Sequence, residues 1–283
     1  MKLNYNSSSE LKTFLEQQGL GMQKKFGQNF LVDANAKRIL VEALDVKAGD
    51  DVWEIGPGLG AMTDLFLEKE IKVKAFEIDK GFIRILKELF GGNENFSLVE
   101  GDVMKTWEEH AKTKAEYLFG NLPYNIAAAL LADFTGNGCI FKRIVVTVQK
   151  ETALRMTAKA GTKDYSSFSV LCASAYKAKP LITISPSSFY PQPNVDSMGV
   201  LLESKGNCLC SPCFYKLVRA LFASRRKTIR NNLTAFVNSK EICEAVLREN
   251  GFSGNERAET LDVDEFLSLA KSIDNMRLYK QEC

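Results

Sequence analysis

The spacing of hydrophobic and polar positions along this chain predicts which segments form strands and which form helices. From residue 51 onward, short runs rich in β-branched and aromatic residues alternate with longer runs whose apolar positions recur every three or four residues. We expect strands at 52–56, 72–78, 96–99, 117–120 and 144–149, and helices at 62–69, 81–90 and 126–134. This alternation predicts an α/β fold, built on a doubly wound sheet of parallel strands.

The pattern changes in the second half of the chain. Two apolar runs, at 168–176 and 197–202, flank a proline-rich segment without helical spacing, which favours an antiparallel hairpin at the sheet edge over another crossover. Helical periodicity then continues after residue 204, at 214–222, 226–237, 240–250, 258–261 and 263–272. We therefore expect two domains, 1–204 and 205–283, of which the second is small and all-helical.

Composition agrees with a packed protein of two domains. The chain has 283 residues, more than a single hydrophobic core usually organises, and its 45% hydrophobic and 25% charged residues are ordinary globular values. The longest uninterrupted apolar run, 126–132, is far shorter than the ~18 residues of a membrane helix. The first residues of the chain lack the apolar stretch of an export signal, so we expect a cytoplasmic protein.

Charge and histidine content narrow the chemistry. The 37 positive and 35 negative side chains give a net charge of +2, which by itself indicates neither nucleic acid nor a membrane surface as partner. His110 is the single histidine, which argues against a histidine-rich zinc site and against Ser-His-Asp or Cys-His catalysis. The expected chemistry is one that needs little histidine.

Three of the seven cysteines lie close together, at Cys208, Cys210 and Cys213. A closed zinc site needs four ligands, and the other cysteines offer no paired spacing. We interpret this segment as an interdomain linker and expect no metal.

A glycine-rich turn at 54–60, Glu-Ile-Gly-Pro-Gly-Leu-Gly, follows a predicted strand and precedes a predicted helix. In that context the glycines let backbone amides approach a ligand closely. The spacing G-x-G-x-G differs from the G-x-G-x-x-G of dinucleotide-binding turns, which disfavours a nicotinamide-dependent oxidoreductase.

Two acids stand at the carboxyl ends of the next two predicted strands. Glu77 stands where a carboxylate can accept hydrogen bonds from both hydroxyls of a ribose, and Asp102 could accept one from an adenine amino group. Together with the glycine turn they fit a nucleoside cofactor without pyrophosphate, of which S-adenosylmethionine is the obvious example. The alternative is that these are turn glycines and helix-capping acids.

The turn after the fourth strand, at 120–125, suits methylation of an exocyclic amine. The Asn121 side-chain oxygen and the Leu122 carbonyl could hold the amine hydrogens, while Pro123 fixes the turn and Tyr124 stacks on the base. This geometry aims the nitrogen lone pair at the sulfonium methyl, and the proton can leave to water without a histidine base. The alternative is a plain β-turn.

These residues resemble the small-subunit ribosomal RNA adenine dimethyltransferases, from about residue 24 to residue 261. The matching segments are 25–31, 54–60, 120–125, 188–193 and 225–233. The resemblance implies a Rossmann-like methyltransferase sheet, with parallel strands and an antiparallel edge hairpin, followed by the small helical domain.

The resemblance also implies roles for individual residues. Those lining the methionine end of the cofactor would be Gln28, Asn29 and Leu31, with Gly56 and Gly58 beside it. Glu77 would hold the ribose, Asp102 the adenine, and Asn121 both the cofactor and the target amine. Phe189 would form a second aromatic wall, opposite Tyr124, for a base swung out of its RNA stack.

The implied reaction is methyl transfer from S-adenosylmethionine to N6 of two adjacent adenosines near the 3′ end of small-subunit (16S) ribosomal RNA. The implied substrate is an immature 30S particle, which would receive four methyl groups. Two alternatives stay open. One is the large-subunit adenine methyltransferase of macrolide resistance, which usually carries Ile at the position of Leu122; the other is an assembly factor that acts mainly by binding.

A basic stretch in the predicted helical domain could contact RNA phosphates. Its six positive residues, with no acid among them, are Lys216, Arg219, Arg225, Arg226, Lys227 and Arg230. The alternative is a solvated helical face. We expect a monomer that binds RNA and no membrane.

Overall fold

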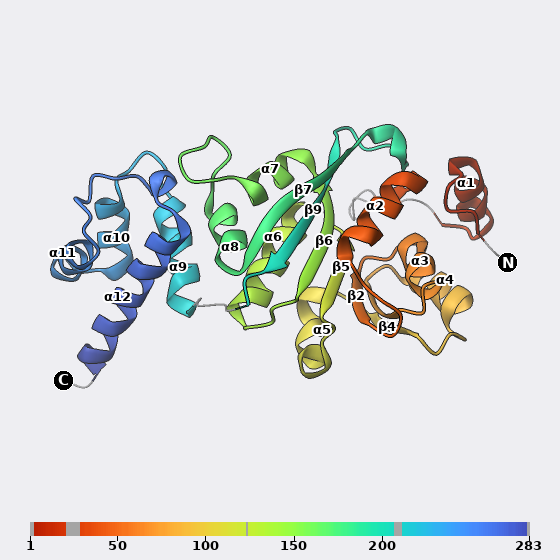
Figure 1. Ribbon diagram of the computed structural model, residues 1–283, viewed down its shortest axis with the longest axis horizontal. Helices are drawn as coiled ribbons and strands as arrows, with labels where there is room; N and C mark the ends of the chain where they lie inside the picture. The colour runs from red at the N-terminus through yellow and green to blue at the C-terminus, as the bar shows by residue number, and fades with distance from the viewer. Residues whose placement is uncertain (1–2, 21–28, 123, 207–210, 282–283) are drawn as a thin grey trace. The chain divides into compact units, whose positions relative to one another are not determined.

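The computed structural model describes residues 3–20, 29–122, 124–206 and 211–281 (Figure 1). The chain divides into two compact units. The sheet unit comprises Met1–Ala127, Phe141–Ala153 and Lys179–Glu203, and the helical unit comprises Ala128–Ile140, Leu154–Ala178 and Ser204–Cys283. The helical unit thus takes in two earlier segments besides the C-terminal helices, and the sequence-based division at residue 205 stays a prediction.

A seven-stranded sheet confirms the predicted fold class. Its strands follow the order β4 (Phe96–Glu100), β3 (Lys72–Glu77), β2 (Asp51–Ile55), β5 (Tyr117–Asn121), β6 (Arg143–Gln149), β9 (Ser197–Ser204) and β7 (Tyr176–Ile184). Strands β4, β3, β2, β5 and β6 are parallel, and β9 runs antiparallel to β6. Because the chain proceeds from β2 to one side and from β5 to the other, a crevice is expected at the carboxyl ends of these two strands.

The helices in the first part of the chain are α2 (Ala34–Leu44), α3 (Ala61–Leu67), α4 (Lys80–Phe90), α5 (Val103–His110) and α6 (Tyr124–Gly136). Of these, α2, α4 and α5 begin at acidic caps, whereas α3 begins at Gly60. Asp33, Asp79 and Asp102 accept hydrogen bonds from the first free N–H groups of α2, α4 and α5. A carboxylate at this position satisfies an unpaired donor and complements the helix dipole, so each strand-to-helix turn is locally specified.

One face of the sheet packs against α2 and α3. Val52, Phe119 and Val145 from three neighbouring strands share a buried core with Leu40 of α2 and Phe66 of α3. Successive strand residues alternate between faces, so these side chains all point to the same side. This core places the start of α3 directly after the glycine turn.

An N-terminal arm, of which the structure describes residues 3–20 and 29–32, covers part of the sheet unit. Its helix α1 (Ser8–Gln17) joins a buried cluster with Phe30, Leu59 and Phe82, and its short strand β1 (Phe30–Leu31) pairs with β8 (Phe189–Tyr190). The Tyr5 hydroxyl donates a hydrogen bond to the Leu59 carbonyl at 3.0 Å. The arm is therefore tied directly to the glycine turn.

The edge hairpin exists, but the prediction for its first strand was wrong. The run at 168–176 forms α8 (Ser167–Ala175), and the strand β7 starts only at Tyr176. Helix α8 is buried on most sides, and a short apolar run of this kind does not distinguish a buried strand from a buried helix. Pro180 lies within β7 at the sheet edge, a position where its missing N–H is tolerated.

The helical unit contains α9 (Pro212–Phe222), α10 (Ile229–Val237), α11 (Lys240–Glu249) and α12 (Val263–Gln281), drawn from cyan to dark blue in Figure 1. Its core includes Phe214, Leu217 and Phe266, and the rings of Phe222 and Phe266 stack with centroids 5.8 Å apart. The remaining elements of the chain are α7 (Lys150–Thr157) and the 3-10 turns Ala111–Thr113, Pro186–Ser188 and Ala258–Thr260.

Within the described ranges, no helix has the length and apolar character required to cross a membrane. The same residues contain no group of three or more His, Cys, Asp or Glu side chains arranged to hold a metal ion. Cys213 is buried, whereas Cys208 and Cys210 lie outside the described residues.

The close approach of α3 and α4 at Gly60 gives a first testable prediction. Gly60 has φ 84°, and a Cβ there would lie 2.4 Å from the Phe90 ring. Gly60→Ala should lower the free energy of unfolding by about 3 kcal/mol, through left-handed strain plus overpacking, in urea denaturation. Gly49 has φ 89° with no atom within 4 Å of such a Cβ, so Gly49→Ala should lose only about 1 kcal/mol. Equal losses would contradict the packing argument.

Candidate active site

A cavity of about 450 Å³ opens at the carboxyl ends of the central strands, where the strand order reverses. Gly56, Glu77, Asp102 and Asn121, which the sequence places after four different strands, all line it. Parallel strands bring their carboxyl ends to one edge, which explains why residues distant in sequence meet here.

The glycine turn forms one wall of the cavity. Gly56 and Gly58 have φ values of 69° and 58°, in the left-handed region that favours glycine. A Cβ at Gly58 would lie 2.8 Å from the Phe30 ring, so this glycine lets the arm pack closely on the turn. A Cβ at Gly56 would meet no atom within 4 Å, which leaves open space beside the backbone at that position.

Glu77 is a buried carboxylate at the end of β3. It accepts hydrogen bonds from the N–H groups of Gly58 at 3.1 Å and of Ile78 and Asp79 at 2.9 Å. Burial raises the pKa of Glu77, and these N–H groups act in the opposite direction. The contacts fix the carboxylate in the cavity wall, and its predicted contact with a ribose stays a prediction.

Glu54 is a site residue that was missed in the sequence analysis. It lies on β2, is only 2% exposed, and accepts a hydrogen bond from the Thr63 hydroxyl at 2.6 Å. Burial raises its pKa to about 7, and the neighbouring Glu77 carboxylate adds to this effect. The signal was a charged residue inside an otherwise apolar strand, since such a residue is seldom buried without a functional or structural reason.

The predicted catalytic turn is anchored on two sides. The Asn121 side-chain amide donates to the Asn29 carbonyl at 2.9 Å, which leaves the Asn121 side-chain oxygen as an acceptor. The Leu122 N–H donates to the Thr147 carbonyl on β6, also at 2.9 Å. The structure thus brings together Asn29, Asn121 and Leu122. Gln28, Pro123 and the Tyr124 side chain lie outside the described residues.

For Asp102 and Phe189, the positions in the structure differ from what their predicted roles require. Asp102 lines the cavity, but its Oδ1 accepts from the Met104 N–H at 3.0 Å as the cap of α5. Leu31 lines the cavity, whereas Phe189, its partner across β1 and β8, is 2% exposed and packs in the core. A base can stack on the Phe189 ring only after a rearrangement, so that role and the adenine contact of Asp102 stay predictions.

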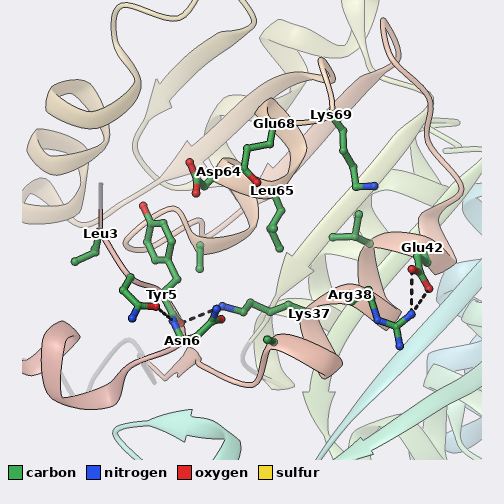
Figure 2. Close-up of a pocket in the computed structure, with 14 residues that line it drawn as sticks. Leu3, Tyr5, Asn6, Lys37, Arg38, Glu42, Asp64, Leu65, Glu68 and Lys69 are labelled. Carbon is green, nitrogen blue, oxygen red and sulfur yellow. Dashed lines mark hydrogen bonds and ion pairs between the residues drawn. The ribbon is translucent and has the colours of Figure 1, made fainter. Parts of the chain in front are cut away.

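A second, larger cavity of about 570 Å³ lies between residues 3–6, α2 and α3 (Figure 2). Arg38 pairs with Glu42 at 2.9 Å, and Lys37 reaches from α2 to donate to the Tyr5 carbonyl at 3.0 Å. Burial lowers the pKa of Lys37 to about 8. These contacts hold the N-terminal segment in place, whereas the groups that suit a nucleoside line the smaller cavity. We therefore assign the candidate active site to the 450 Å³ cavity.

The basic stretch of the helical unit is only partly available for a ligand. Arg225 pairs with Glu259 at 3.0 Å, and Arg230 pairs with Glu244 at 2.8 Å. The exposed members whose side chains form no ion pair or hydrogen bond with the described part of the chain are Lys216, Arg219, Arg226 and Lys227. Contact of this stretch with RNA stays a prediction.

Comparison with known families and structures shows which proteins this chain is similar to. The family described as ribosomal RNA adenine dimethylase matches residues 19–275. A ribosomal RNA small subunit methyltransferase A of Treponema denticola is 48% identical, over 96% of this chain and 97% of that protein. A protein with the same name in Borreliella afzelii is 40% identical, over 96% of both chains.

Two solved structures share the fold. A dimethyladenosine transferase from Plasmodium falciparum has a TM-score of 0.75 and 27% identity, covering 86% of this chain and 96% of that one. The 23S rRNA methyltransferase ErmE has a TM-score of 0.61 and 21% identity, covering 86% and 99%. The second likeness concerns the fold alone.

The raised pKa of Glu54 leads to a prediction about pH. A carboxyl with a higher pKa in the folded state binds its proton more tightly there, so stability falls as the pH rises from about 4.5 towards 7. Glu54→Gln keeps an acceptor for Thr63 but cannot ionise. It should raise the free energy of unfolding by about 3 kcal/mol at pH 8, and by no more than about 1 kcal/mol at pH 5, in urea titrations.

The control for this experiment is Glu108→Gln, the same substitution at an exposed glutamate. The difference between Glu108→Gln and the parent protein should not change between pH 5 and pH 8. An effect of Glu54→Gln that is constant over the same range would contradict the burial argument.

Proposed function

The chain belongs to the ribosomal RNA adenine dimethylase family, and we propose that it methylates N6 of two adjacent adenosines near the 3′ end of small-subunit ribosomal RNA. Four methyl groups from S-adenosylmethionine would give two N6,N6-dimethyladenosines in an immature 30S particle. The observation that carries this proposal is the placement of Asn121, held at 2.9 Å by Asn29, in one cavity with the glycine turn and Glu77.

The charge of the cavity supports S-adenosylmethionine as the cofactor. Of the described residues that line it, three are acids, Glu54, Glu77 and Asp102, and none is Lys, Arg or His. A pyrophosphate would be repelled by this lining, whereas a sulfonium cation is favoured by it. The open space at Gly56 provides room for a ligand beside the backbone.

The residues of the catalytic turn would act by positioning. S-adenosylmethionine supplies an electrophilic methyl group on a positively charged sulfur. In the first transfer to each adenine, the free oxygen of Asn121 and the carbonyl of Leu122 would accept the two N6 hydrogens, so that the nitrogen lone pair faces that methyl group. In the second transfer, one of these two acceptors would hold the single remaining hydrogen. The N6–carbon bond would form as the sulfur–carbon bond breaks, and the extra proton on nitrogen would pass to water. No side chain must serve as a base, which agrees with the lack of histidine in the cavity lining.

The choice of ribosomal subunit follows the relatives. Proteins of 40–48% identity over nearly the whole chain are named as small-subunit enzymes, whereas the large-subunit enzyme ErmE has 21% identity. We therefore favour small-subunit RNA and treat large-subunit RNA as the alternative that the experiment must exclude.

The test uses the full chain, labelled S-adenosylmethionine and 30S particles from a strain that lacks this methylation. Primer extension should stop at two adjacent adenosines near the 3′ end of the RNA.

Asn121→Ala should retain cofactor affinity within about threefold but lose at least a hundredfold in turnover, because it removes an acceptor that orients the amine. Glu77→Ala should instead raise the dissociation constant of S-adenosylhomocysteine about tenfold or more in calorimetry.

Three outcomes would contradict the proposal. They are label that appears only in 23S RNA, an Asn121→Ala variant that is fully active, and a Glu77→Ala variant that binds S-adenosylhomocysteine like the parent. A catalytically inactive variant that still supports maturation of the subunit would favour an assembly factor that acts by binding.

The exposed part of the basic stretch gives a separate prediction. Replacing both Arg226 and Lys227 by Ala should weaken binding to 30S particles, and should reduce the slope of log affinity against log salt by roughly 1 per lost phosphate contact. The matched control is the double change Lys240→Ala and Lys271→Ala, which removes the same charge from exposed positions on α11 and α12. An equal change in slope for both pairs would show that only net charge matters.

A further inference from the structure

Thr147 on β6 carries a buried polar atom that the described part of the fold does not use. The residue is 2% exposed, and its hydroxyl has no hydrogen-bond partner within the described ranges of the chain. A buried hydroxyl without a partner destabilises a protein, and valine has nearly the same shape without this penalty. A threonine at this position therefore calls for a ligand that satisfies it.

The surroundings of Thr147 connect it to the candidate active site. Its backbone pairs in register with Asn121 of β5. Two positions earlier on the same strands, Phe119 and Val145 are also paired, and both pack in the core on one face of the sheet. The side chains of Asn121 and Thr147 therefore lie on that same face, on strands about 4.8 Å apart. Thr147 lines the same cavity as Asn121, and its carbonyl holds the Leu122 N–H at 2.9 Å.

The order of the strands shows which part of a cofactor reaches Thr147. Along the sheet edge, Asp102 follows β4, Glu77 ends β3, the glycine turn follows β2, Asn121 ends β5 and Thr147 lies on β6. With the nucleoside at Glu77 and Asp102, the opposite end of the cofactor extends towards Asn121 and Thr147. That end of S-adenosylmethionine is an amino acid, with one carboxylate and one ammonium group.

The charge of the lining explains why a hydroxyl would be needed there. A carboxylate in this cavity faces Glu54 and Glu77, and no Lys, Arg or His among the described lining residues balances it. It therefore requires neutral donors away from these acids, and β6 is separated from β2 by β5. Because Thr147 is buried whereas Asn121 is exposed, the hydroxyl is better placed for a bound cofactor than for an RNA base entering from solvent.

We propose that the Thr147 hydroxyl donates a hydrogen bond to the carboxylate of the amino-acid end of S-adenosylmethionine, and so positions the methyl group beside Asn121. This inference rests on the proposed function, because it requires that cofactor. It also assigns a purpose to the unpartnered hydroxyl: stability of the free protein is lower so that affinity for the cofactor is higher.

The test compares two ligands that differ only in the amino-acid end. S-adenosylhomocysteine has it, and 5′-methylthioadenosine lacks it. In calorimetry, Thr147→Val should weaken S-adenosylhomocysteine binding about tenfold, as expected for a lost hydrogen bond to a charged group, and change methylthioadenosine binding less than about twofold. Thr147→Ser, which keeps the hydroxyl, should bind both ligands nearly as the parent does.

Thermal denaturation of the ligand-free protein supplies an independent measurement. Thr147→Val should raise the melting temperature by about 2–4 °C, because it removes a buried unsatisfied group. A lower melting temperature would show that the hydroxyl has a structural partner, and would overturn the proposal. This measurement also shows whether the variant folds.

The binding results separate the two proposals. Equal weakening of both ligands, or of neither, by Thr147→Val would overturn the role of Thr147 while the proposed function stands. Unchanged S-adenosylhomocysteine affinity with a lower kcat would indicate contact with the target base, and would also overturn it. A parent protein that binds S-adenosylhomocysteine no better than methylthioadenosine would refute recognition of the amino-acid end, and one that binds neither would refute both proposals.

Discussion

The hydrogen bond from the Asn121 side chain to the Asn29 carbonyl joins two segments 92 residues apart, and the geometry of the site depends on it. It connects the last residue of β5 to the residue just before β1, the strand of the arm that pairs with β8. Because one side of the Asn121 amide is engaged in this way, its oxygen is left in a defined direction. In the proposed reaction, the arm would therefore act by orienting a residue of the sheet, in addition to lining the cavity.

The cavity places buried acids where a soluble domain would ordinarily place apolar residues. Glu54 and Glu77 are 2% and 5% exposed, and their partners are a hydroxyl and backbone N–H groups rather than basic side chains. Such a site is poorly suited to phosphates and well suited to a cation, which agrees with a sulfonium cofactor. The Thr147 hydroxyl has no hydrogen-bond partner among the described residues, and together with these acids it makes the site less stable than an apolar one would be.

Much of the fold could be predicted because buried parallel strands are short apolar runs with clear ends. Strands β2, β3 and β5 differ from their predicted limits by a residue or so, since Gly56, Asp79 and Asn121 mark turns and caps close to where they stop. Helix α8 was assigned to a strand because its apolar residues are buried on most sides and show no helical spacing. In the basic stretch, Arg225 and Arg230 resemble their neighbours in sequence, and only the packing of Glu259 and Glu244 beside them distinguishes their roles.

By itself, the sequence determined the class of fold and the position of the glycine turn. It also identified Glu77, Asp102 and Asn121 as candidate site residues, because all of these follow from local patterns at the ends of strands. Only the tertiary structure decided which residues share the cavity, that Phe189 packs in the core, and that Glu54 and Thr147 are buried beside the catalytic turn. The physical reason is that burial and hydrogen-bond partnership are properties of contacts between distant segments. A sequence pattern records which side of a strand is apolar, but not which polar atom on that side is left without a partner.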